Sequence, residues 1–128
     1  MRRLILAAIV LAAAAGSAAA QDADKGEHVF AKCKPCHQIG DGAVNMLGPE
    51  LNGIDGRKAG TVADYPYSDA NKDSGIVWNE KTFKQYIKNP KAMVPGTKMF
   101  FIGISKQQDI DDLWAYVSQF NADGSKKK

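Results

Sequence analysis

A long stretch without helical or strand patterning, residues 38–78, limits the folds open to this chain more than any other feature. The stretch is rich in Gly, Pro and Asn, and only Asp69-Ala70-Asn71 suggests a short helical turn. A connection of this length is uncommon in a compact domain unless something else supplies the core that it surrounds. We therefore expect a large bound group at the centre of the fold, with the loop wrapped around it.

Apolar residues at helical spacing flank this loop and predict a small all-α domain, with three main helices, short helical turns and few strands. The first helix is expected to have Asp24 as its N-cap, with Glu27 three residues later, and to deliver Cys33. Its apolar face comprises Val29, Phe30 and Cys33.

Two further helices are expected after the loop. One should begin at Asn79 and end before Pro90, because a proline disfavours helix in the residue before it. The other should follow the capping box Ser105-Lys106-Gln107-Gln108. The apolar stripe of the first of these contains Phe83, Tyr86 and Ile87, and that of the second contains Ile110, Leu113, Trp114 and Val117.

Residues 1–20 are typical of a secretory signal peptide: Arg2 and Arg3 precede an apolar run, and small residues end at Ala20. The run is shorter than the roughly 18 to 20 apolar residues that a membrane span needs. We expect cleavage after Ala20, with an uncleaved anchor or a shifted site as alternatives. Residues 21–128 would then be one periplasmic domain, with 125–128 as a flexible tail.

The charge of that domain is nearly balanced. Loss of Arg2 and Arg3 leaves 15 of the 17 basic residues against 14 acidic ones, a formal net charge of +1. No further long apolar stretch follows the leader in the sequence. The composition therefore gives no reason to expect nucleic acid or a membrane anchor as partner, and we expect a monomer.

The two cysteines of the chain lie in Cys33-Lys34-Pro35-Cys36-His37. A disulfide is the simplest expectation for an exported pair. C-x-x-C followed by His is instead typical of c-type haem attachment, in which both thiols add to the haem and His37 binds the iron. Three alternatives are a thioredoxin-like redox disulfide, which needs a βαβ context, structural zinc, for which only His28 remains, and chance occurrence.

Whether the iron has a second axial ligand distinguishes two functions. A closed sixth position favours electron transfer, and an open one favours the binding or catalysis of small molecules. The candidates are Met46, Met93, Met99 and His28. His28 lies too near the motif on its own helix to reach the opposite haem face, and a single methionine is more often core than ligand. Met99 stands apart because it ends the rigid turn Pro95-Gly96-Thr97-Lys98-Met99, and Met93 is the reserve.

The chain resembles the class I, mitochondrial-type cytochromes c, and specifically their periplasmic bacterial branch, the cytochrome c2 group. The similarity covers nearly all of the mature chain in order and spacing. Beyond the haem motif, it includes Gly48-Pro49, Gly56-Arg57-Lys58, Tyr67-Ser68-Asp69-Ala70-Asn71-Lys72, Gly75-Ile76-Val77-Trp78, Asn89-Pro90-Lys91, the turn ending at Met99, and Asp112-Leu113.

The resemblance implies a role for individual residues. Met99 would be the sixth ligand, and the Pro49 carbonyl would orient His37, which fixes its tautomer. Phe101 would flank the exposed haem edge. The haem propionates would be bound by Arg57, Tyr67 and Trp78, and the polar network beside the Met99 sulfur would consist of Asn71, Tyr86 and Thr97. The crossing of the terminal helices would involve Gly26, Phe30, Leu113 and Tyr116.

The function implied is that of a diffusible one-electron carrier and not an enzyme, with one covalent haem c performing the chemistry. Electrons would come from a membrane quinol-oxidising complex and pass to a terminal oxidase or a photosynthetic reaction centre. A haem enzyme or gas-binding protein is the rival class and would require Met99 to be displaced, and a haem-free thiol-disulfide protein is the third.

Partners would dock on lysines that flank the haem edge, namely Lys32, Lys91, Lys98 and Lys106. Many relatives also have lysine where this chain has Met46, Ala92 and Ser105. Such charges chiefly set the encounter rate. We therefore expect weaker electrostatic steering here than in those relatives.

Overall fold

The computed structural model describes residues 20–128, so the predicted signal peptide lies outside the described part except for Ala20. The helices are α1 (Ala23–Phe30), α2 (Asp69–Lys72), α3 (Glu80–Lys88), α4 (Pro90–Met93) and α5 (Gln107–Val117). Residues 20–128 contain no strand and only two isolated bridges, Lys58 with Val77 and Phe120 with Lys126. The predicted all-α fold with three longer helices is confirmed.

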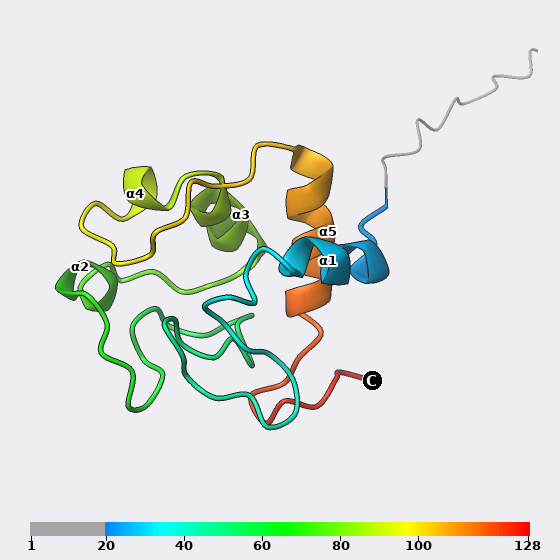
Figure 1. Ribbon diagram of the computed structural model, residues 1–128, viewed down its shortest axis with the longest axis horizontal. Coiled ribbons are helices and arrows are strands. Elements are labelled where there is room, and N and C mark those ends of the chain that lie inside the picture. The colour runs from blue at the N-terminus through cyan, green and yellow to red at the C-terminus, as the bar shows by residue number, and fades with distance from the viewer. Residues whose placement is uncertain (1–19) are drawn as a thin grey trace, which may run out of the picture.

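The N- and C-terminal helices, α1 and α5, cross each other at one side of the molecule (Figure 1). Helix α3 also packs on α5, and the two short helices α2 and α4 lie on the side away from the crossing. The long loop fills the remaining part of the molecule in Figure 1. None of the helices in residues 20–128 has the length and apolarity that a bilayer crossing requires.

The cap of α1 differs from the prediction. The cap is Asp22, whose carboxylate accepts hydrogen bonds from the N–H groups of Asp24 (3.0 Å) and Lys25 (3.1 Å). Asp22 is itself held at the start of the helix, because its own N–H donates to Oδ1 of Asp112 at 2.9 Å. A contact with the far end of the sequence therefore sets where α1 begins, and Asp24 lies in its first turn.

The capping box predicted at Ser105 is also wrong. Helix α5 begins at Gln107 after Lys106, which makes no side-chain capping bond. Gln108, the residue expected to reach back to Ser105, instead donates from Nε2 to Oδ1 of Asp112 at 2.8 Å. Because the Gln108 side chain is bonded to the buried Asp112 carboxylate, it does not form the predicted capping box with Ser105.

Helix α3 starts as predicted. The Asn79 side chain accepts from the N–H of Thr82 at 2.9 Å, and the Thr82 hydroxyl accepts from the N–H of Asn79 at 2.9 Å, which completes a capping box. The helix ends at Lys88, and Pro90 then opens α4 at the position where a missing N–H costs nothing.

The core forms mainly where α1 and α3 meet α5. Ile110, Leu113 and Val117 are almost fully buried, which confirms the predicted apolar face of α5. Aromatic rings fill the rest of the contact: Phe83 and Trp114 have centroids 5.3 Å apart, and Phe30 and Tyr116 5.4 Å apart. These helices therefore form a rigid support beside the long loop.

One ion-pair network joins α3 to α5 and should make stability depend on pH. Lys84 Nζ lies 2.8 Å from Glu80 and 2.9 Å from Asp111. Burial works against its charge, but hydrogen bonds to Asp111 and Glu80 leave the pKa of Lys84 raised. Hydrogen bonds from Lys84 and Gln107 lower the pKa of Asp111, and bonds from Lys84 and Gln21 lower that of Glu80.

A carboxylate whose pKa is lowered by folding stabilises the fold above its unfolded pKa of about 4 and loses that effect as the pH falls through the folded value. Asp111→Asn should therefore reduce the free energy of unfolding at pH 7 by less than about 1 kcal/mol, since the groups are near the surface. Thermal unfolding should show this difference at pH 7 and none near pH 2. A difference that persists at pH 2 would contradict the electrostatic origin.

Candidate haem-binding site

The haem motif forms a tight turn directly after α1. The N–H of His37 donates to the Cys33 carbonyl at 2.9 Å, and the N–H of Cys36 donates to the same carbonyl at 3.1 Å. Residues three apart on such a helical turn lie on one side of it. Cys33 and Cys36 are both free thiols and half-buried, so the turn places them as a pair for one large ligand.

The acidity of Cys33 does not fit a redox-active disulfide. Burial is the main cause that raises the pKa of the Cys33 thiol to about 11, with Lys32 acting against it and Cys36 adding to it. Reactive C-x-x-C cysteines have the opposite property, a lowered pKa that keeps the thiolate. This observation disfavours the haem-free thiol-disulfide alternative.

His37 is held in one orientation with one nitrogen available. Its Nδ1 lies 2.7 Å from the Pro49 carbonyl oxygen, and since a carbonyl only accepts, Nδ1 carries the proton. The lone pair of Nε2 is then available to a metal. Burial lowers the pKa of His37, with the Pro49 bond acting against this and the charge of Arg57 adding to it. The imidazole is therefore neutral at neutral pH, as a ligand must be.

Gly48 leaves room for this ring. A Cβ at this position would lie 2.3 Å from Cε1 and 2.6 Å from Nδ1 of His37. We expect Gly48→Ala to push the ring away from the Pro49 carbonyl and to weaken binding of His37 to the iron. The haem-loaded variant should show an altered absorption spectrum at neutral pH. Ala31→Gly, an exposed change just after α1, is the control, and an unchanged spectrum for Gly48→Ala would contradict the close contact.

Among the candidates for the sixth ligand, the structure favours the two in the α4–α5 region. Met93 and Met99 are half-buried and pack on the core, whereas Met46 and His28 are exposed. The N–H of Met99 donates to Thr97 Oγ1 at 3.3 Å. Thr97 Oγ1 in turn lies 3.0 Å from the hydroxyl of Tyr86 on α3. Thr97 and Tyr86, two of the residues expected beside the Met99 sulfur, are therefore hydrogen-bonded to each other, and Thr97 also accepts from the Met99 backbone.

Asn71 takes a different place from the other members of that network. Its Oδ1 accepts from the Ser68 hydroxyl at 2.8 Å, and Ser68 caps α2. Among the hydrogen bonds of residues 20–128, none joins Asn71 to Thr97 or Tyr86. The Nδ2 group of Asn71 is free to donate to a ligand.

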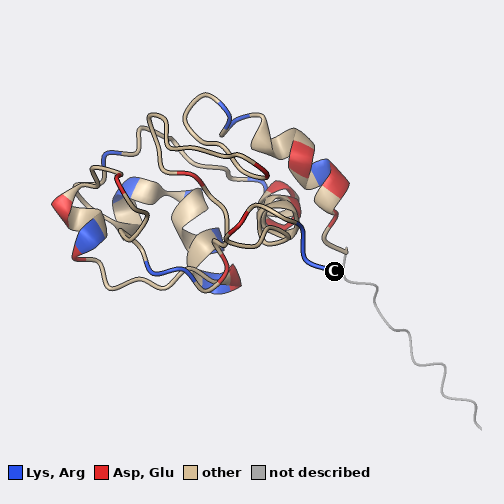
Figure 2. Ribbon diagram, turned by 90° about the horizontal axis from the view of Figure 1, so that it is seen from below, with Lys and Arg blue, Asp and Glu red and all other residues tan. Residues whose placement is uncertain are grey.

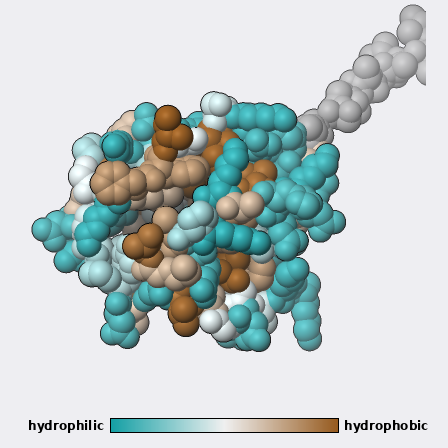
Figure 3. Space-filling view, in the orientation of Figure 1, coloured by the Kyte–Doolittle hydropathy of each residue, from teal (hydrophilic) through white to brown (hydrophobic). Residues whose placement is uncertain are grey.

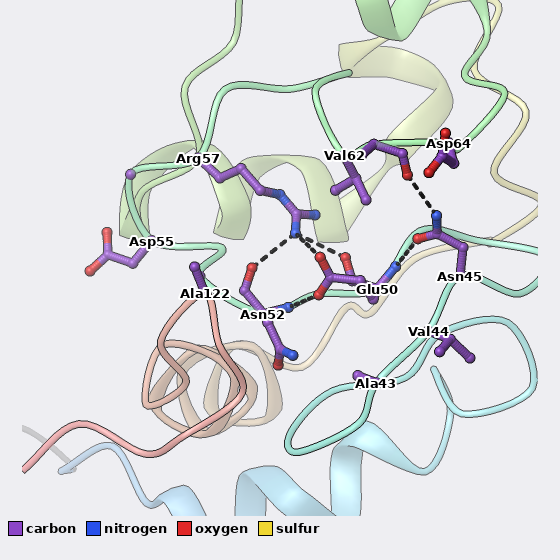
Figure 4. A pocket seen from close by; sticks show the side chains of 13 residues that line it. Ala43, Val44, Asn45, Glu50, Asn52, Asp55, Arg57, Val62, Asp64 and Ala122 are labelled. Atoms are coloured by element: carbon purple, nitrogen blue, oxygen red, sulfur yellow. Dashed lines mark hydrogen bonds and ion pairs between the residues drawn. The ribbon is translucent and has the colours of Figure 1, made fainter.

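Arg57 is anchored by the long loop itself. Its Nη1 donates to the carbonyl oxygens of Glu50 (2.9 Å) and Asn52 (3.0 Å) and lies 3.7 Å from the Glu50 carboxylate (Figure 4). Burial lowers the pKa of Arg57, while Tyr67 and Glu50 raise it. Arg57, Glu50 and Asn52 border an open hollow of about 620 Å³.

The three residues expected to bind propionates all have donors to spare. Tyr67 accepts from the N–H of Val62 at 3.1 Å, which leaves its hydroxyl hydrogen available. Trp78 is 7% exposed, and its indole N–H makes no hydrogen bond within residues 20–128. No fully buried side-chain nitrogen or oxygen of these residues lacks a partner, so this N–H is accessible from outside the protein. Arg57 uses only Nη1 within the protein. These unused donors fit a bound group that carries carboxylates.

Sequence reasoning missed Glu50 and Asn52. Asn52 is 7% exposed and bonds the Gly40 N–H (2.7 Å) and carbonyl (2.9 Å), which ties the start of the loop to the Arg57 region. Asn52 thus acts on backbone groups twelve residues away, whereas the Glu50 carboxylate accepts from the N–H of Asn52 at 2.6 Å and lies beside Arg57. A polar residue in a loop rich in Asn and Asp gives no pattern that distinguishes this role.

Of the residues expected around the haem edge, Phe101 contacts Met99: its N–H donates to the Met99 carbonyl at 3.1 Å. Phe101 is half-buried against the core. The four expected docking lysines are all exposed, and Lys98 Nζ also donates to the Pro66 carbonyl. Figure 2 shows acidic residues on α1 and α5 and also on the loops and other helices, with basic residues interspersed among them. The four docking lysines are Lys32, Lys91, Lys98 and Lys106.

Comparison with known proteins agrees with this geometry. The sequence model of the family described as cytochrome c matches residues 23–121. The chain belongs to the cytochrome c family. It is 57% identical over 127 residues to cytochrome c2 of Blastochloris viridis, covering 99% of this chain and 100% of the relative.

Further relatives of this cytochrome carry similar names. Cytochrome c-550 of Nitrobacter winogradskyi is 59% identical over 106 residues, covering 83% of this chain and 97% of the relative. The solved structure of cytochrome cH from Methylobacterium extorquens matches with a TM-score of 0.70 and 48% identity, over 75% of this chain and 96% of that one. This cytochrome therefore falls in the class I, cytochrome c2 group, carries one haem c at Cys33 and Cys36, and has the group's general role in electron transport.

Proposed function

We propose that this cytochrome is a diffusible periplasmic one-electron carrier and not an enzyme. It takes electrons from a membrane quinol-oxidising complex and delivers them to a terminal oxidase or a photosynthetic reaction centre. The observation that carries the proposal is the pair of held ligands: His37, oriented by Pro49, and Met99, held through Thr97 and Tyr86. Two such ligands would leave the iron no open position for a substrate or gas, which suits electron transfer.

The haem, when bound, supplies an iron that alternates between Fe(III) and Fe(II). The protein provides orientation and electrostatics. His37 and Met99 are the proposed axial ligands, and a sulfur ligand favours the reduced iron. Arg57, Tyr67 and Trp78 would donate to the propionates, and Asn71 would add a donor near α2.

The rival function is a haem enzyme or gas-binding protein with an open sixth position. An absorption spectrum of the oxidised protein separates the two. A weak sulfur-to-iron band near the red end at neutral pH is expected if methionine is bound. Its absence, together with rapid binding of an added ligand such as cyanide, would contradict the electron-carrier proposal.

The predicted signal peptide gives the cellular location. We propose that residues 1–20 are removed on export and that the mature protein is periplasmic. Mass spectrometry of the protein purified from its host should find Gln21 as the N-terminal residue, with the mass of one haem added. An intact leader would indicate an anchored protein instead.

The docking lysines give a prediction for kinetics. Lys32→Gln with Lys98→Gln should slow reduction by the membrane complex severalfold at low salt and flatten its salt dependence, since exposed charges mainly steer encounter and salt screens them. The matched control, Lys58→Gln with Lys81→Gln, removes the same charge from other exposed positions. Equal rates for both pairs at every ionic strength would contradict the docking face.

A further inference from the structure

The carboxylate of Glu50 faces the guanidinium group of Arg57 inside the long loop (Figure 4). Its Oε1 lies 3.7 Å from Arg57 Nη1, and the side chains of Glu50 and Arg57 are 22% and 14% exposed. The other carboxylate oxygen, Oε2, accepts from the N–H of Asn52 at 2.6 Å. This hydrogen bond holds the Glu50 side chain beside Arg57.

The hydrogen bond to Asn52 does not need a charged acceptor. A neutral amide oxygen also accepts from a backbone N–H. Withdrawing a carboxylate from water costs free energy unless a positive charge compensates it. Within residues 20–128, Arg57 is the one basic side chain in ion-pair distance of Glu50. The charge of Glu50 therefore acts mainly on Arg57.

The other acidic residues that border the hollow beside Arg57 make no ion pair with it in the described part of the chain. Asp55 Oδ2 lies 3.7 Å from Lys127 Nζ, and in Figure 4 its carboxylate points away from the Arg57 guanidinium. Asp64 is exposed to solvent. Glu50 is thus the carboxylate that compensates the charge of Arg57.

The charge of Arg57 matters because this residue is a proposed donor to the haem propionates. Only its Nη1 is used within the protein, so the rest of the guanidinium can face the cofactor. Reduction of Fe(III) to Fe(II) adds one electron and lowers the positive charge of the site by one unit. A positive charge nearby therefore favours Fe(II), and a negative charge favours Fe(III). By compensating Arg57, Glu50 should lower the reduction potential.

Burial should make this pair more effective than charges at the surface. Figure 3 shows a mostly hydrophilic surface on the face that it draws, and charges on such a surface are hydrated and screened by salt. Glu50 and Arg57 are largely shielded from solvent. Salt should therefore weaken their effect on the iron much less than that of an exposed charge.

We propose that Glu50 acts through Arg57 to set the reduction potential of this cytochrome, as a fixed counter-charge in the hollow that both residues border. This inference rests on the proposed electron-carrier function. It makes Glu50 a positioning residue for the charge of Arg57. Since Glu50 lowers the potential, the reduced cytochrome gives up its electron to an acceptor more readily.

The test measures the reduction potential of haem-loaded variants by spectroelectrochemical titration at neutral pH, at low and high ionic strength. Glu50→Gln keeps an acceptor for the Asn52 N–H and removes the charge. At the midpoint potential of the parent, it should raise the ratio of Fe(II) to Fe(III) about fivefold, or about 40 mV at 59 mV per tenfold, at both ionic strengths. Glu50→Asp keeps the charge and should stay within about twofold of the parent.

Asp55→Asn is the matched control, because it removes one negative charge from an exposed position in the same hollow, where Asp55 pairs with Lys127. Its effect on the ratio should be less than about twofold at low salt and absent at high salt. The red-end sulfur band and denaturant unfolding of each variant show whether the haem ligands and the fold are intact.

An unchanged potential for Glu50→Gln, with or without a loss of stability, would overturn the inference and leave Glu50 a purely structural role. A shift no larger than that of Asp55→Asn, or one that high salt abolishes, would also overturn it. So would a Glu50→Asp protein with an intact spectrum and a potential raised about fivefold in ratio. A parent that binds cyanide rapidly would instead contradict the electron-carrier proposal, while the shift in haem potential would still decide the role of Glu50.

Discussion

Met99→Ala should lower the reduction potential of the haem-loaded protein by about 0.2 V, a part of the roughly 0.8 V range that axial ligands span. The sulfur of a methionine stabilises Fe(II) relative to Fe(III), so its loss favours the oxidised form. The red-end sulfur band of the oxidised protein should disappear at the same time. Spectroelectrochemical titration at neutral pH measures both changes.

Met93→Ala is the matched control for this prediction. Met93 is half-buried like Met99 and lies only six residues earlier, at the end of α4. The structure ties Met99, through Thr97, to Tyr86, so Met93→Ala should leave the potential and the sulfur band in place. The reverse outcome, with Met99→Ala unchanged and Met93→Ala altered, would assign the ligand to Met93.

Gly26→Ala should strongly destabilise the fold. The α1–α5 crossing places Gly26 so close to α5 that a Cβ would lie 1.9 Å from the Asp112 carbonyl oxygen and 2.8 Å from Tyr116 Cβ. Alanine favours a helix over glycine by up to about 1 kcal/mol. The overlap with a backbone atom forces the helices apart and should outweigh this gain, for a net loss of about 3 kcal/mol.

Denaturant unfolding of the haem-loaded variant gives the size and sign of this change. Lys25→Ala, on the exposed side of the same helix, should change the free energy of unfolding by less than about 0.5 kcal/mol. An increase in stability for Gly26→Ala would show that helix propensity dominates and that the crossing can relax. A loss equal to that of the control would contradict the close contact.

Sequence patterns predicted what is encoded locally. Asn79 with its apolar stripe predicted α3, because the cap and the buried face lie within one short segment. The caps of α1 and α5 were predicted wrongly, because the Asp112 carboxylate on α5 accepts hydrogen bonds both from the N–H of Asp22, at the start of α1, and from the side chain of Gln108 on its own helix. A side chain that joins the two ends of the chain leaves no local pattern.

In the candidate haem site, too, the contiguous residues were predicted and the contacts between distant segments were not. The turn from Cys33 to His37 is contiguous, so its residues and their chemistry were evident from spacing, and Pro49 was found to bond His37 as the resemblance implied. Arg57 was expected to act on the cofactor, but its anchoring by Glu50 and Asn52 carbonyls was not. Backbone carbonyls occur at every residue, so no residue type marks the ones that are used.

The covalent attachment of the haem at the motif that follows α1 affects how this protein denatures. The thioether bonds at Cys33 and Cys36 keep the cofactor on the same chain when the loop opens and the Met99 contact is lost. For a dissociable cofactor, stability rises with the concentration of free ligand. Here reassembly is intramolecular, so the unfolding midpoint should be the same at any dilution, and repeated cycles of unfolding should return the original spectrum without added haem.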